Sequence, residues 1–128
     1  WTLRLHYHAD TPVKDPLFGV GLYAPDGHCI YGTNTAVTGY RLPDISGDGY
    51  VDFIIDDLTL MQGTYVLSVG IHDRTATRFY DYIDREVGFR VEPNGSEGGR
   101  PGVVLLPDQW DHVAAGAPAT ILGGKRMD

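Results

Sequence analysis

The segment QGTYVLSVGIHD at positions 62 to 73 constrains the fold of this chain more than any other. Successive side chains of a β-strand point to opposite faces, so a period of two divides the segment into two rows. The apolar row consists of Tyr65, Leu67, Val69 and Ile71. The opposite row consists of Val66, Ser68, Gly70 and His72. We predict a strand whose first row is core. The second row is nearly bare backbone ending in an imidazole, which suits the floor of a shallow polar pocket.

The composition indicates a single all-β domain. A chain of 128 residues suits one core, and 17 Gly and 8 Pro among many Val, Ile, Tyr and Thr favour short strands joined by tight turns. A formal charge of -7 argues against sequence-independent nucleic-acid binding and against anionic lipid surfaces, because both require a basic patch. The single cysteine, Cys29, excludes an internal disulfide and is compatible with a reducing compartment, so we expect a cytoplasmic location.

The same alternation predicts further strands along the chain. They are expected at 2–9, 17–24, 28–33, 51–58, 64–72, 78–83, 87–92 and 103–106. Pro25-Asp26-Gly27 predicts a tight turn, and a long loop is expected from Asn34 to Gly49, where Asn34 locks a turn through side-chain to backbone bonds. Strands this short and evenly spaced, without a helical period, predict an antiparallel β-sandwich.

The sequence also allows predictions about membrane segments and about the two ends of the chain. No apolar run is long enough to span a bilayer, and no signal peptide opens the sequence. Because Trp1 lies inside a strand pattern and is not a methionine, we expect the chain to be cut from a longer polypeptide. We predict a folded domain over 1–112 and a low-information tail over 113–128. The connector PNGSEGGRPG at 93–102 spans about 33 Å when extended, so strand 103–106 can pair with its own sheet or with that of a second copy.

Several motifs resemble a known family in their order and spacing. They are PLFGVGLYAPDGHCIYGTNT at 16–35, LTLMQGTYVLSVGIHD at 58–73, Tyr80-Asp81, Phe89-Arg90-Val91 and GVVLLPDQW at 102–110. Together they resemble the C-terminal domain of Wzt proteins, the nucleotide-binding subunits of bacterial ABC transporters that export O-antigen polysaccharide. The resemblance implies an immunoglobulin-like β-sandwich that recognises the end of the polysaccharide. It also implies a further strand before Trp1 and a homodimer made by exchange of the C-terminal strand. Through the full-length protein, the domain would join the transporter's ATPase and membrane subunits at the inner membrane.

A sugar site needs an aromatic plane for the C–H face of the ring and polar groups for the hydroxyls. If strands 17–24, 64–72 and 87–92 are neighbours, one sheet face has a lowered floor made of Gly19, Gly21, Ser68, Gly70 and Gly88. The candidate carbohydrate-binding residues are Tyr23, Ser68, His72, Arg78, Tyr80, Tyr82 and Arg90. The alternative is that these glycines permit twist or close packing of a neighbouring subunit.

Two patterns suggest metal binding and have simpler interpretations. His6 and His8 lie two apart on one strand face, but a third ligand such as His72 would have to come from elsewhere. We interpret the pair as solvated or as a polar sugar contact and predict no metal site and no cofactor. The segment DISGDGYVD at 44–52 resembles a calcium-binding loop, but Ile55 stands where the bidentate acid belongs, so we predict an ordinary turn.

The acidic pairs Asp56-Asp57 and Asp81 to Asp84 are interpreted as solvated strand ends, because nothing fixes the separation that a glycoside hydrolase requires. No catalytic residue is predicted. The chain is therefore interpreted as a non-catalytic carbohydrate-binding module that recognises O-antigen polysaccharide for export. The alternatives are a dimerisation or assembly module, which would cover His72 and Arg90, and a polysaccharide-active enzyme domain.

Overall fold

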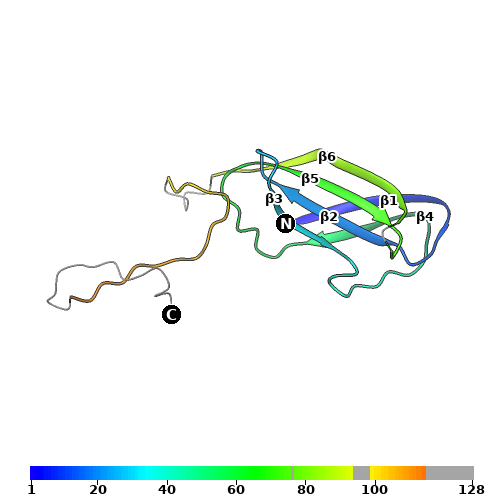
Figure 1. The fold of residues 1–128 in the computed structure, drawn as a ribbon, viewed down its shortest axis with the longest axis horizontal. Helices are drawn as coiled ribbons and strands as arrows, with labels where there is room; N and C mark the ends of the chain where they lie inside the picture. Colours follow the sequence, from blue (N-terminus) through cyan, green and yellow to red (C-terminus); the bar gives the residue numbers. More distant parts are fainter. Residues whose placement is uncertain (76, 94–98, 115–128) are drawn as a thin grey trace.

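In the computed structural model, which describes residues 1–75, 77–93 and 99–114, the chain forms two antiparallel sheets (Figure 1). The strands are β1 (Thr2–Val13), β2 (Leu17–Tyr23), β3 (Cys29–Asn34), β4 (Ile45–Ile54), β5 (Gly63–His72) and β6 (Phe79–Val91). The smaller sheet pairs β1 with β4, and the larger has the order β3-β2-β5-β6. The all-β antiparallel prediction is confirmed. The strands predicted at 17–24, 64–72 and 87–92 are neighbours in the larger sheet, which was the condition for a lowered floor on one face.

The core lies between the two sheets and is centred on the apolar row of β5. Tyr65 and Leu67 are each 2% exposed, and Val69 and Ile71 continue the row as partly buried side chains. The residues that pack with them are Val20 and Leu22 from β2, Leu3 and Leu5 from β1, and Phe53 from β4. The period of two therefore identified the buried face of β5 correctly.

The hydroxyl of Tyr65 is the one polar group of that row, and it is satisfied inside the core. It donates to the carbonyl oxygen of Met61 at 2.6 Å. Burial of the ring raises the pKa of Tyr65, which keeps the hydroxyl in its neutral, donating form. A second cluster of buried residues, Phe18, Leu42 and Ile45, extends the core toward the loop between β3 and β4.

The extents of β1, β4 and β6 differ from the sequence prediction by several residues. β1 continues to Val13 through an irregularity after Ala9, and β4 begins at Ile45 rather than at residue 51. Gly49 looks like a turn residue in the sequence, but in β4 it faces Tyr7, and a Cβ there would collide with the tyrosine ring. The segments at 78–83 and 87–92 form the single strand β6, which absorbs two register shifts.

The segment after the connector pairs with its own chain. Met61 donates its backbone N–H to Val103, and Leu105 donates to Thr59, both at 2.7 Å, around a single bridge from Leu60 to Val104. The predicted strand at 103–106 is thus reduced to one bridge.

Residues 107–114, in orange, run away from the sheets (Figure 1), and Trp110 is 98% exposed. Residues 94–98 of the connector and 115–128 of the predicted tail lie outside the described residues. No helix in the described part of the chain is long and apolar enough to cross a membrane.

Candidate functional site

An open cavity of about 350 Å³ lies on the face of the larger sheet that points away from the core. Its floor follows from strand register. Gly19 of β2 faces Gly70 of β5, while Gly21 faces Gly32 on one side and Ser68 on the other. Small residues on three adjacent strands leave the floor close to the level of the backbone, which lets a ligand approach closely.

Gly19 and Gly32 form the open part of this floor. A Cβ built at Gly19 would meet nothing closer than 3.8 Å, and its neighbours include the Nε2 of His72 at 3.9 Å. A Cβ at Gly32 would meet nothing within 4 Å. The role of Gly32 was missed because the sequence pattern did not reveal that β3 pairs with β2 in this register.

The other predicted floor glycines are covered. The ring of Tyr23 folds over Gly21, and that of Tyr82 lies over Gly70, at 3.0 and 3.1 Å from the position of an added Cβ. Gly88 has a different function, because a Cβ there would lie 2.8 Å from the carbonyl oxygen of Tyr65. Gly88 therefore provides clearance between backbones and contributes nothing to the cavity.

The wall on the β6 side is aromatic. Phe79, which is 55% exposed, lies between His72 and Tyr82, with ring centroids 5.3 and 5.5 Å apart. Phe79 pairs with His72 while Tyr82 pairs with Gly70, so an extra residue stands between the two aromatic rings of β6. Strict alternation from Tyr82 predicts that Tyr80, rather than Phe79, lies on the cavity face. Tyr80 does not line the cavity and packs beneath the guanidinium of Arg78, 5.0 Å from the ring centroid.

His72 is 9% exposed, and its hydrogen-bond partners determine its tautomer. Its Nδ1 lies 2.7 Å from the carbonyl oxygen of Asp73. A carbonyl only accepts, so Nδ1 carries a hydrogen, and the Nε2 of the neutral ring is a lone-pair acceptor. This Nε2 lies beside the open floor at Gly19.

The loop that supplies this carbonyl is closed by its own carboxylate. Asp73 accepts hydrogen bonds from the backbone N–H groups of Thr77 at 2.9 Å and Arg78 at 3.2 Å. The hydroxyl of Thr77 also donates to Asp73, at 2.9 Å. These bonds hold the pKa of Asp73 below its usual value against the opposing effect of partial desolvation.

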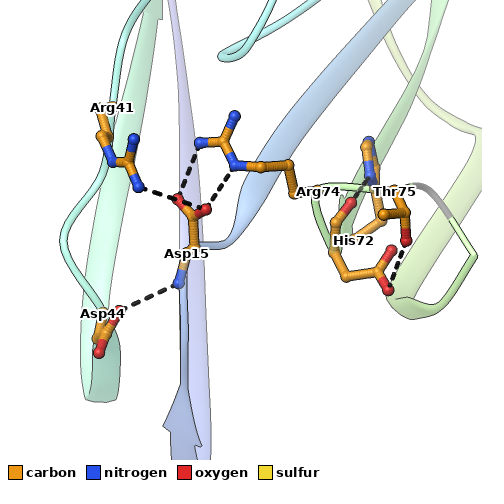
Figure 2. A network of polar contacts seen from close by, with 7 residues as sticks. Asp15, Arg41, Asp44, His72, Arg74 and Thr75 are labelled. Carbon is orange, nitrogen blue, oxygen red and sulfur yellow. Dashed lines mark hydrogen bonds and ion pairs between the residues drawn. The ribbon is translucent and has the colours of Figure 1, made fainter.

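An ion-pair network ties the same loop to the body of the domain (Figure 2). Arg74 places Nη2 2.9 Å from Oδ1 of Asp15, and Arg41 lies 3.6 Å from the same carboxylate. The backbone N–H of Asp15 donates to Asp44 at 3.1 Å. The hydrogen bond from Arg74 lowers the pKa of Asp15, with a smaller contribution from Arg41. Three loops therefore meet beside His72.

Beside the cavity residue Ser68, β6 places Asp84, which the sequence pattern predicts to be part of a solvated strand end, and Arg85, for which the pattern makes no prediction. Ser68 is 4% exposed and bonds through Oγ to Oδ1 of Asp84 at 2.8 Å. Arg85 contacts both oxygens of Asp84 and also covers the ring of Tyr23, 5.0 Å from its centroid. The φ of Arg85 is 57°, in the left-handed region, which is an unusual conformation for an arginine and one that no sequence pattern signalled.

Tyr23, Ser68, His72 and Tyr82 are brought together by the structure, and all four line the cavity. Arg90 lines a separate depression with Gln62 and Thr64 at the far end of the sheet, and it pairs with Glu92 at 3.0 Å. Asn34, which also lines the cavity, accepts from the backbone N–H of Val37 at 2.8 Å, which confirms the predicted turn lock.

The histidines considered as metal ligands are not brought together. His6 and His8 lie on β1 of the smaller sheet, and His72 lies on the larger one. His8 is 2.6 Å from Asp48 and 2.7 Å from Asp10. Within the described ranges, no group of three or more His, Cys, Asp or Glu residues is placed to hold a metal.

The predicted turn at 44–52 is wrong, because residues 45–52 belong to β4. Two of its acids point out of the smaller sheet and pair with β1. Asp48 contacts His8, and Asp52 receives a bidentate hydrogen bond from Arg4 at 2.9 and 3.0 Å. An extended strand spreads these carboxylates along the sheet, whereas a calcium site requires them to converge.

Comparison with known proteins identifies a family and a similar fold among solved structures. The family model described as the Wzt C-terminal domain matches residues 1–106. A crystal structure of the C-terminal domain of Wzt superposes with a TM-score of 0.60 at 20% sequence identity, covering 88% of this chain and 69% of that chain. At this identity the likeness establishes the fold alone. Among curated proteins, none matches the chain.

Proposed function

The chain belongs to the Wzt C-terminal domain family, and from that membership we propose that it recognises the O-antigen polysaccharide exported by a bacterial ABC transporter. In this proposal the domain binds the glycan without catalysing a reaction and requires no cofactor. It acts at the cytoplasmic side of the inner membrane, joined in the full-length protein to an ATPase domain and through it to the membrane subunits.

The observation that carries the proposal is the glycine-floored cavity with an aromatic wall. A sugar ring placed on the floor at Gly19 and Gly32 would turn its C–H face toward Phe79 and Tyr82. Its hydroxyls would reach the Nε2 of His72. None of the described lining residues is Lys, Arg, Asp or Glu, as suits an uncharged polyol.

The test is a titration of ¹⁵N-labelled protein with the O-polysaccharide of the host bacterium, followed by NMR. We expect the amide signals of Gly19, Gly32 and Gly70 to shift, and we expect His72→Ala to weaken the response. His28→Ala is the matched control, since His28 lies in an exposed turn and pairs with Asp26. If the folded protein shows no change in the glycine signals at millimolar sugar, glycan recognition is not its function.

We also propose that the domain is an immunoglobulin-like sandwich that dimerises by exchanging its C-terminal segment. The chain passes between the two sheets from β1 to β2, from β3 to β4 and from β4 to β5, as sandwich topologies do. The bonds that Val103 and Leu105 make to residues 59–61 can equally be made by the same segment of a second copy.

The exposed side chains of Leu106 and Trp110, at 68% and 98%, support the exchange because a partner would cover them. Light scattering after size exclusion should give the mass of a dimer, and a chain ending at residue 102 should give a monomer. A shortened chain that remains dimeric would place the interface elsewhere. Protection of the glycine face in the dimer without sugar would favour the assembly function over glycan binding.

A further inference from the structure

The direction of the hydrogen bond at Ser68 follows from the charge of its partner. Arg85 donates to both carboxylate oxygens of Asp84, at 3.0 and 3.2 Å. These bonds, followed by the one from Ser68, lower the pKa of Asp84, so the group is an ionised carboxylate at neutral pH. An ionised carboxylate only accepts, and the 2.8 Å contact therefore uses the single hydroxyl hydrogen of Ser68. Toward the cavity, Ser68 presents lone pairs.

Two more side chains present hydrogen-bond acceptors to the cavity. The hydroxyl of Tyr82 lies 3.4 Å from the same oxygen of Asp84, which again can only accept, so its hydrogen points away from a ligand. The Nδ1 of His72 donates to the carbonyl of Asp73, which leaves Nε2 as an acceptor. Three side chains on two strands of the cavity thus offer lone pairs.

The donors around the cavity come mainly from β2 and β3. β2 and β5 are interior strands of the larger sheet, so their backbone N–H groups are used in pairing with neighbours on both sides. Arg85 is engaged with Asp84 and Tyr23. Among the described lining side chains, the remaining donors are the hydroxyls of Tyr23 and Thr33, the thiol of Cys29 and the amide of Asn34, whose oxygen is occupied by Val37.

We propose that this cavity selects neutral sugar residues with free hydroxyl groups and rejects residues that carry a phosphate, sulfate or carboxylate at the recognised position. The inference rests on the proposed glycan function and specifies its substrate class. A hydroxyl beside Ser68, His72 or Tyr82 can donate to these acceptors, whereas an anionic oxygen at the same place would face lone pairs and lose hydration that they cannot replace. The net charge of -7 acts in the same direction. We expect the anionic counterpart of a bound sugar to bind at least about tenfold more weakly.

The experiment compares matched probes on the ¹⁵N-labelled protein. The methyl glycosides of glucose, mannose and galactose are each titrated beside the corresponding uronic acid and 6-phosphate, with Gly19 and Gly32 as reporters. Neutral sugars should shift these signals at lower concentration than their anionic counterparts. If an anionic sugar binds as tightly as its neutral partner, the inference is overturned and glycan recognition stands. If no probe and no O-polysaccharide binds, the glycan function fails and the inference fails with it.

Two further measurements test the cause of the selectivity. In the free protein, the ¹⁵N shifts of the His72 ring should show hydrogen on Nδ1 and none on Nε2, and the reverse tautomer would contradict the assignment. Asp84→Asn introduces an amide that can donate to Ser68 and release its hydroxyl hydrogen toward the cavity, so the preference for neutral sugars should shrink. Asp81→Asn is the matched control on the same strand, because within the described ranges the Asp81 carboxylate accepts from the backbone N–H of Tyr82 and makes no contact with Ser68. An unchanged preference in Asp84→Asn would overturn the mechanism.

Discussion

Replacing Gly19 by alanine should reduce glycan affinity without reducing stability. Gly19 lies in β2, and an added methyl would meet its nearest atoms, on Asn34 and Thr33, at 3.8 Å. That is an ordinary van der Waals distance, so neither strand has to move. We therefore expect the free energy of unfolding to change by less than about 0.5 kcal/mol. The floor of the cavity, in contrast, rises by one carbon atom.

The loss of affinity can be estimated from what that carbon displaces. A sugar resting on the floor would be lifted by roughly one C–C bond length, about 1.5 Å. Hydrogen bonds to His72 and Ser68, formed at about 2.8 Å, would then exceed the distance at which they contribute. Each is worth about 1 kcal/mol net, so losing two costs about 2 kcal/mol, which corresponds to a Kd roughly 30-fold higher.

The assay pairs an NMR titration with chemical unfolding, and Gly88→Ala is the control. Gly88 lies in the same sheet, but an added Cβ would approach the carbonyl oxygen of Tyr65 to 2.8 Å, so the backbone has to shift. That protein should lose roughly 1–3 kcal/mol of stability and keep its affinity while folded. The reasoning is refuted if Gly19→Ala binds the polysaccharide as tightly as the wild-type protein.

Three further changes test the supporting structure. Tyr65→Phe removes the 2.6 Å hydrogen bond to a buried carbonyl and should lower the free energy of unfolding in urea by roughly 1–2 kcal/mol, whereas an unchanged midpoint would show that the bond contributes nothing. Asp15→Asn weakens the pairing with Arg74, so the amides of the loop after β5 should exchange faster with deuterium, and equal rates would contradict the role of the network. Hydrogen bonds to Asp48, then Asp10, raise the pKa of His8, so its NMR titration should give a value above 6.5 that falls in Asp48→Asn. Since the folded pKa is the higher one, any stability from this contact is present below the unfolded pKa and is lost as the pH rises through the folded pKa.

Alternation was sufficient to predict the parts of the structure that a single strand encodes. The burial of Tyr65 and Leu67 follows from the period of two within β5 alone, and so does the position of Ser68 and His72 on the opposite face. The turn after Tyr23 is equally local, since Gly27 donates its N–H to the carbonyl of Ala24, the residue just before Pro25.

Features that depend on a partner strand could not be predicted in this way. Gly49 resembles a turn residue until the ring of Tyr7 on the neighbouring strand is placed over it. The sequence between Asp84 and Val87 looks like the end of one strand and the start of another, yet the chain continues through it because Arg85 adopts a positive φ. Register and bulges are set by pairing between segments far apart in the chain, and single-segment patterns do not contain that information.

The two irregularities of β6 both border the cavity, and this explains why the floor was easier to predict than the walls. The first turns Phe79 toward His72, and the second brings Asp84 to Ser68 and Arg85 over Tyr23. β6 is an edge strand of the larger sheet, so it can hold extra residues without breaking a second ladder, whereas β2 and β5 are paired on both sides and cannot. The rigid interior strands therefore fix the depth of the cavity, and the irregular edge strand determines which side chains surround it. Changes of specificity should consequently be possible within β6 at little cost to the core.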